Sequence, residues 1–119
     1  MSEKYLFIGA HADDLEFTVA GTVAQLIRNG NRVDEILMTD SRGDKGKNQS
    51  VIRKSEAEEG ASILGVDHVF HVGLEHNFRD GELIQHPLDA LMPAVLHIVK
   101  DAAIKQDPYS GVISFSKYG

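Results

Sequence analysis

The stretch Tyr5-Leu6-Phe7-Ile8, followed after one glycine by Ala10-His11-Ala12-Asp13-Asp14, decides how the rest of the chain is interpreted. Four consecutive apolar or aromatic residues without polar alternation are typical of a strand that is buried on both faces of a parallel sheet. Ligands of open α/β sheets sit outside the carboxyl ends of the strands. His11, Asp13 and Asp14 are therefore expected at the edge of the sheet where a functional site forms.

The residue types that follow this strand suit a metal site with a neighbouring base. A catalytic zinc is held by about three His or carboxylate ligands and keeps one position open for water. In His11-x-Asp13-Asp14, the adjacent carboxylates cannot easily point the same way, so one can bind metal while the other takes a proton from water. The alternative is a solvated turn in which Asp13 or Asp14 caps the following helix. Spacing alone leaves both interpretations open.

Length and composition exclude several classes of protein. We expect one domain over residues 1–119, and 42% hydrophobic residues are enough for a buried core. The net charge of -6, with scattered Lys and Arg, provides no basic patch for nucleic acid or an anionic membrane. The absence of cysteine excludes disulfides and thiolate metal sites.

No apolar window approaches the ~20 residues of a membrane span, and the run after Met1-Ser2-Glu3-Lys4 is too short for a signal peptide. We therefore expect a cytoplasmic protein without a membrane span. A dinucleotide site is disfavoured, because Gly9 stands alone where a G-x-G-x-x-G pattern would be needed.

Apolar runs at strand spacing alternate along the chain with apolar positions at helical spacing. This alternation is the signature of a parallel sheet with right-handed crossovers. We predict an α/β fold with three layers and a Rossmann-like, mostly parallel sheet in the order 3-2-1-4. The predicted strands cover 5–8, 33–39, 69–72 and 111–116, and the predicted helices cover 19–27, 50–64 and 88–102.

Glycine and proline mark the limits of these helices. Gly30 and Gly65 are predicted to end the first two helices. Pro93 is tolerable in the third helix only near its first turn or at a kink. We expect a polar loop at 40–50 and an irregular segment at 73–81.

Four stretches, in order and covering nearly the whole chain, resemble the LmbE-like or PIG-L family of zinc-dependent N-acetylglucosaminyl de-N-acetylases. They are His11-Ala12-Asp13-Asp14 with Gly21-Thr22, Thr39-Asp40 with Gly43-Asp44-Lys45-Gly46, Arg53-x-x-Glu56-Ala57 with Leu64-Gly65-Val66, and Gly73-Leu74 with Asp80-Gly81-Glu82-Leu83.

The resemblance implies a role for each matched site residue. His11 and Asp14 ligate zinc, Asp13 is the general base, and Arg53 hydrogen-bonds sugar hydroxyls. The implied substrate is a small N-acetylated sugar conjugate, which loses acetate and keeps a free amine. Zinc is inherited from the family, because His and carboxylate ligands alone do not choose among divalent metals.

The chain departs from the family pattern at three points. Ala12 replaces the usual proline, and Thr18-Val19-Ala20 stands where the family has a glycine-rich segment. The third zinc ligand and a second histidine come from a His-x-x-His element after the fourth strand, which would begin beyond Gly119. The chain therefore resembles the amino-terminal part of a family member.

Other histidines have simpler explanations than ligation. His76 is the most interesting, because it follows the third strand on the same side of the sheet as His11, yet a surface position is favoured. An edge, loop or helix-surface position explains the others, which are His68, His71, His86 and His97.

Two hypotheses of different classes follow. The first is a zinc amidohydrolase acting on an N-acetylglucosamine-type conjugate. The second is a non-catalytic α/β module, or a truncated family member without a complete metal site. Because the fourth strand can leave an edge or apolar face exposed, we also expect a homo-oligomer.

Overall fold

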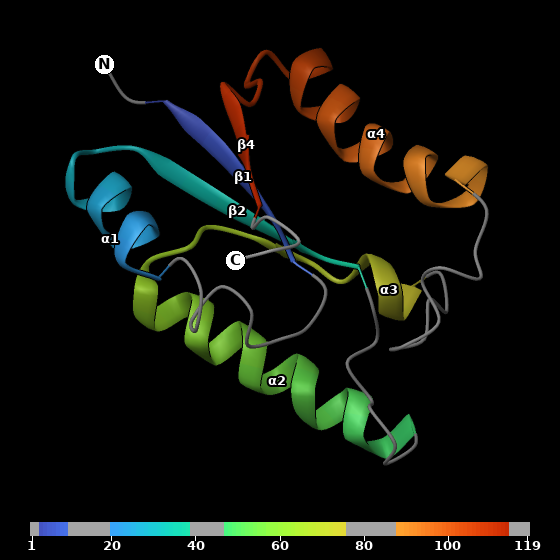
Figure 1. Ribbon diagram of the computed structural model, residues 1–119. Helices are drawn as coiled ribbons and strands as arrows, with labels where there is room; N and C mark the ends of the chain where they lie inside the picture. The colour runs from blue at the N-terminus through green and yellow to red at the C-terminus, as the bar shows by residue number, and fades with distance from the viewer. Residues whose placement is uncertain (1–2, 10–19, 39–46, 76–87, 115–119) are drawn as a thin grey trace.

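Strand β1 (Lys4–Gly9) lies inside a four-stranded parallel sheet of order β3-β2-β1-β4. The structure, a computed structural model, describes residues 3–9, 20–38, 47–75 and 88–114 (Figure 1). Its other elements are α1 (Ala20–Arg28), β2 (Arg32–Leu37), α2 (Lys47–Leu64), β3 (Val69–Phe70), α3 (Val72–Glu75), α4 (Leu88–Ile104) and β4 (Gly111–Ile113).

The register of the strands confirms the predicted α/β fold and strand order. β1 pairs with β2 along its whole length, from Lys4 opposite Arg32 to Gly9 opposite Leu37. Its other side pairs with β4, where Leu6 lies opposite Val112. All pairings are parallel, so the carboxyl ends of β1 and β2 meet at one edge of the sheet.

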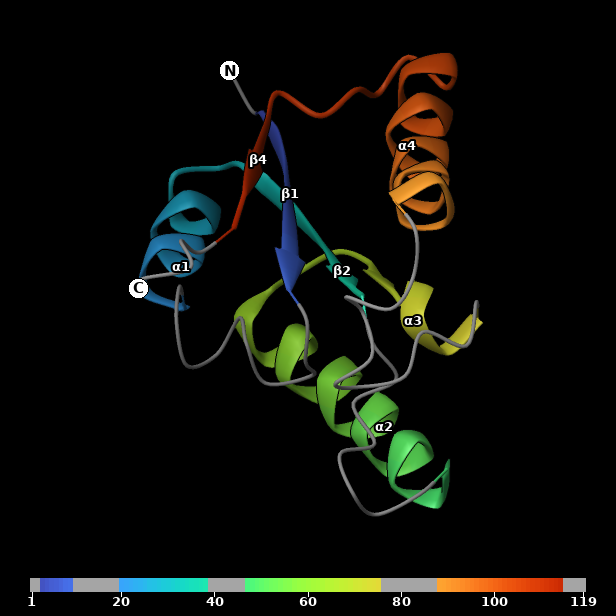
Figure 2. The same cartoon turned by 45° about the vertical axis from the view of Figure 1, so that its right-hand side comes forward.

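Alternate side chains of the central strands bury opposite faces of the sheet. Phe7 and Val33 pack against α1 and α2, in a cluster completed by Val23, Ala61 and Val66. Leu6 and Ile36 point the other way and cluster with Val72 and Ala94 of α3 and α4. Figure 2 shows α4 on the opposite side of the sheet from α1 and α2. The sheet is therefore the middle of three layers.

Each of the three long helices ends in the same hydrogen-bonded turn. Gly30 and Gly65 adopt positive φ values of 90° and 89°, which confirms their predicted role as helix stops. After α2, the Val66 amide donates to the Ala61 carbonyl and the Gly65 amide to the Ser62 carbonyl, as in a Schellman motif. α4 ends with the same pair of bonds, but there Gln106 takes the left-handed position, with φ of 60°.

Several predicted boundaries differ from the structure. The third strand was predicted to include Val72, but Val72 begins α3, where the Glu75 amide donates to the His71 carbonyl. Burial of Val72 against Leu6 and Ile36 accounts for its apolar character without strand pairing. α2 starts at Lys47 instead of Ser50, and β2 ends at Leu37.

Two further predictions concern Pro93 in α4 and the limits of β4. Pro93 lies in the second turn of α4, just beyond the first turn where it was expected to be tolerated. β4 begins at Gly111 as predicted, and the proposed strand residue Ser116 lies outside the described residues. None of the described helices is both long and apolar enough to cross a membrane.

The left-handed residue of the shared helix-ending turn predicts opposite changes in the free energy of unfolding for substitutions at Gln106 and Gly65. Gln106→Gly should raise the free energy of unfolding by about 0.5–1 kcal/mol, because a left-handed side-chain residue is strained. Gly65→Ala should lower it by about 1 kcal/mol, because it introduces that strain and brings a Cβ to 3.4 Å from Ile27 Cγ2. Urea unfolding of both variants tests this, and effects of the same sign would contradict it.

Candidate active site at the carboxyl edge of the sheet

Three strand ends reach the same level at the carboxyl edge of the sheet. Gly9, the last residue of β1, pairs with Leu37, the last residue of β2. Phe70 of β3 pairs with Ile36, so His71 comes level with Leu37. Parallel α/β sheets place their ligands at this edge.

The predicted metal ligands and base follow directly from this edge. His11, Asp13 and Asp14 come two, four and five residues after Gly9 in the sequence. All three lie outside the described residues. Ligation by His11 and Asp14, and proton transfer by Asp13, therefore stay predictions.

Helix α2 carries the predicted sugar contact, Arg53. α2 leads from the carboxyl end of β2 to the amino end of β3, so its first turns lie toward the carboxyl edge. The backbone of Arg53 lies one turn before Ala57, which is buried against Leu37 at the end of β2. The structure thus brings the Arg53 backbone toward the predicted site, and its contact with sugar stays a prediction.

The same helix holds a histidine at this edge through a carboxylate. Glu58 of α2 lies with its Oε1 3.1 Å from Nε2 of His71, whose side chain is only 10% exposed. Burial lowers the pKa of His71 below 6.5, more than the hydrogen bond and charge of Glu58 raise it. The imidazole is therefore neutral at pH 7 and fixed in orientation by Glu58.

The burial of His71 differs from the prediction from sequence, which was an edge or surface position. β3 is an edge strand of the described sheet, but the His71 side chain that follows it is only 10% exposed, with Glu58 of α2 at its Nε2. Glu58 lies 13 residues away in sequence, so no local spacing marks the pair. Only the register of β3 and the path of α2 bring them together.

The remaining histidines agree with their predictions where they are described. His68 and His97 are exposed, and His97 lies on α4 as expected. His76 and His86 lie outside the described residues. Within the described part of the chain, no three His, Asp or Glu side chains are arranged to hold a metal ion.

The environment of His71 predicts how stability depends on pH. Because its pKa is lower in the folded state, the unfolded state binds more protons as pH falls. The free energy of unfolding should decrease as pH falls through about 6.5 toward the folded pKa. Urea unfolding between about pH 8 and about pH 5 should show a smaller pH dependence for His71→Gln than for the unmodified chain.

His68→Gln is the matched control, since it removes an exposed histidine next to the same strand. It should leave the pH dependence unchanged. Equal pH dependence in the unmodified chain and His71→Gln would show that burial of His71 does not couple to folding.

Comparison with known proteins agrees with the fold. An N,N'-diacetylchitobiose deacetylase from Pyrococcus horikoshii, solved with its inhibitor MPG, is 27% identical with a TM-score of 0.70. The match covers 92% of this chain and 39% of that one. GalB, the 4-carboxy-2-hydroxymuconate hydratase from Pseudomonas putida KT2440, is 20% identical with a TM-score of 0.61 and shares the fold. That match covers 89% of this chain and 44% of the hydratase.

The chain thus spans roughly two fifths of the length of these two structures. A family model described as GlcNAc-PI de-N-acetylase matches residues 6–117, from β1 to beyond β4. The matched region includes His11, Asp13, Asp14 and Arg53. The chain therefore belongs to the PIG-L family.

Proposed function

We propose that this chain supplies the water-activating part of a zinc-dependent hydrolase that removes acetyl groups from N-acetylglucosamine-type sugar conjugates. The observation that carries this proposal is the family match over residues 6–117, which spans the His11–Asp14 motif and Arg53 together. The chitobiose deacetylase supports it, because its 27% identity extends over 92% of this chain.

The donor atoms on this chain fit zinc. His11 offers an imidazole nitrogen and Asp14 a carboxylate oxygen, both of which are common zinc ligands. A chain without cysteine has no thiolate to close the site with sulfur ligands. When bound, zinc polarises a carbonyl and lowers the pKa of a water molecule. Another divalent metal with the same ligand preference would satisfy the same residues.

The chain's own residues then have separate tasks in the hydrolysis. Asp13 accepts a proton from the water that attacks the acetamide carbon. That proton is returned to the acetamide nitrogen as the C–N bond breaks, which gives acetate and the free amine. Arg53 donates hydrogen bonds to the hydroxyls of the sugar and so orients the acetamide. Neutral His71, fixed by Glu58, keeps α2 against the edge of the sheet from which these groups act.

Asp13→Asn tests the reaction directly. It should reduce acetate release from N-acetylglucosamine conjugates by at least a factor of ~100, because a general base contributes about 10²–10⁴-fold. Zinc content by metal analysis should stay unchanged, whereas His11→Ala should lower it. The measurement is made on this chain and on the longer product wherever the reading frame continues past Gly119.

Two further variants sharpen the result. Arg53→Gln should raise KM for the sugar with little change in zinc content, since Arg53 is assigned to substrate binding and not to the metal. Asp67→Asn, an exposed carboxylate between α2 and β3, is the matched control and should behave like the unmodified chain. Absence of both zinc and acetate release from every form would favour a non-catalytic α/β module.

We also propose that the chain forms a homo-oligomer through β4. Among the described residues, β4 pairs on one side only, with β1, and its Val112 side chain is 58% exposed. Exposed edge strands invite pairing with another chain. Analytical ultracentrifugation should show a dimer or a larger species, and Val112→Lys should shift the equilibrium toward the monomer. A monodisperse monomer at all concentrations would refute the proposal.

A further inference from the structure

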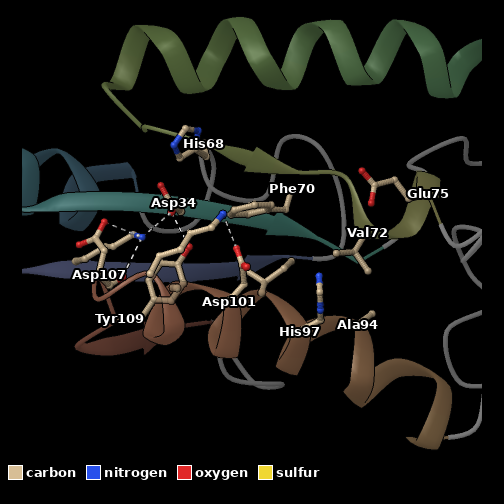
Figure 3. Close-up of a pocket in the computed structure, with 14 residues that line it drawn as sticks. Asp34, His68, Phe70, Val72, Glu75, Ala94, His97, Asp101, Asp107 and Tyr109 are labelled. Atoms are coloured by element: carbon tan, nitrogen blue, oxygen red, sulfur yellow. Dashed lines mark hydrogen bonds and ion pairs between the residues drawn. The ribbon is translucent and has the colours of Figure 1, made fainter.

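A cavity of about 690 Å³ lies between α4 and the face of the sheet that carries Leu6 and Ile36. Its volume falls within the ~300–1,000 Å³ of small-molecule sites. Figure 3 shows Phe70 and Val72 on the sheet side and Ala94 and His97 rising from α4 toward them. The middle of the cavity therefore has apolar walls at Phe70, Val72 and Ala94, with the imidazole of His97 beside them.

One end of the cavity is built around a buried carboxylate. Asp34, in the middle of β2, is 1% exposed, and the Tyr109 hydroxyl donates a hydrogen bond of 2.5 Å to its Oδ2. Burial and this hydrogen bond raise the pKa of Tyr109 well above its usual value, so the hydroxyl keeps its proton. Oδ1 of Asp34 is buried and has no hydrogen-bond partner among the described residues.

The nearest cation, Lys4, pairs with Asp34 only on the Oδ2 side and lies closer to Asp107. Lys4 Nζ lies 3.8 Å from Oδ2 of Asp34 but donates hydrogen bonds of 3.2 Å to both the backbone carbonyl and Oδ2 of Asp107. It also sits 4.5 Å from the centroid of the Tyr109 ring. Lys4 is thus held by Asp107 and Tyr109, and no donor in the described part of the chain reaches Oδ1 of Asp34.

Asp107 is in turn held by a second cation. Arg32 donates hydrogen bonds of 2.6 and 2.9 Å to its two carboxylate oxygens. These contacts and those from Lys4 lower the pKa of Asp107 to about 2. Asp107 is therefore ionised at neutral pH and paired with both Lys4 and Arg32, and Lys4 cannot turn toward Oδ1 of Asp34 without breaking this network.

The lining of the cavity is acidic overall. The carboxylates in the lining outnumber the ammonium groups. The carboxylates belong to Asp34, Glu75, Asp101 and Asp107, and the ammonium groups to Lys4 and Lys105. Lys105 is paired with Asp101 at 2.9 Å. A ligand that donates a hydrogen bond suits this lining, because Oδ1 of Asp34 is a buried acceptor without a partner among the described residues. The excess of carboxylates favours a donor that is positively charged.

We propose that this cavity binds a small primary ammonium compound with an apolar body, its ammonium group donating to Asp34 and its body lying against Phe70, Ile98 and Ala102. The polar end lies at the amino side of the strands, at Lys4 and Asp34, opposite the carboxyl edge assigned to hydrolysis. Binding here is independent of the proposed reaction.

Three probes of equal length separate charge from apolar contact. Amide spectra of the isotope-labelled chain are recorded while n-hexylammonium, n-hexanol or hexanoate is added at matched ionic strength. Hexylammonium should cause saturable shifts at Asp34, Ala102 and Tyr109, with an affinity at least ten times that of hexanol. Hexanoate should cause none, because it would bring a carboxylate against Asp34.

Variants test the assignment to Asp34 and to the cavity. Asp34→Asn should lower the affinity for hexylammonium at least tenfold and leave that for hexanol unchanged, whereas Asp67→Asn, outside the cavity, should alter neither. Ala102→Leu keeps every charge but fills the apolar part, so it should abolish binding of both probes even if Asp34→Asn fails to fold. Equal binding of hexylammonium and hexanol, preference for hexanoate, or saturable shifts confined to residues outside the cavity would each overturn the proposal.

Discussion

The fold depends on the complete burial of two neighbouring side chains, Leu6 and Phe7 of β1. Because adjacent residues of a strand point to opposite faces, burying both requires a layer of helices on each side of the sheet. In this chain the strands beside β1 each follow a helix that covers the sheet, and both pairings of β1 are parallel. The same constraint places Gly9, the residue before the His11–Asp14 motif, in the interior of the carboxyl edge.

This dependence explains which features were predictable from sequence. The apolar run at Tyr5–Ile8 and the glycines at positions 30 and 65 act locally, through strand burial and left-handed backbone, and both were predicted correctly. Val72 was assigned to the wrong element because its burial depends on contacts with Leu6 and Ile36, not on its neighbours in sequence. An apolar residue is equally suited to a buried strand or a buried helix.

The polar residues of the interior were harder to predict. Asp34 and Glu35 interrupt the apolar pattern of β2, and this interruption is a signal in the sequence that polar groups lie inside the fold. The partner of Asp34, Tyr109, lies 75 residues away, so the pair forms only when β4 and its preceding loop reach the sheet. The His71–Glu58 pair has the same origin in tertiary structure. The proposed metal site, in contrast, was predicted from a short stretch of sequence, His11 to Asp14, that resembles a motif of the PIG-L family.

The pairing of the first strand with the last described strand also affects how the chain is made. Lys4 and Asp107 are bound to each other across 103 residues. At a synthesis rate of about 5–20 residues per second, one side of β1 waits roughly 5–20 s for β4 to emerge from the ribosome. During that interval the unpaired backbone amides and carbonyls on this side of β1 can form hydrogen bonds with any extended segment nearby. Slow translation or a delayed β4 would therefore expose the nascent protein to aggregation, and chaperone binding at β1 would protect it.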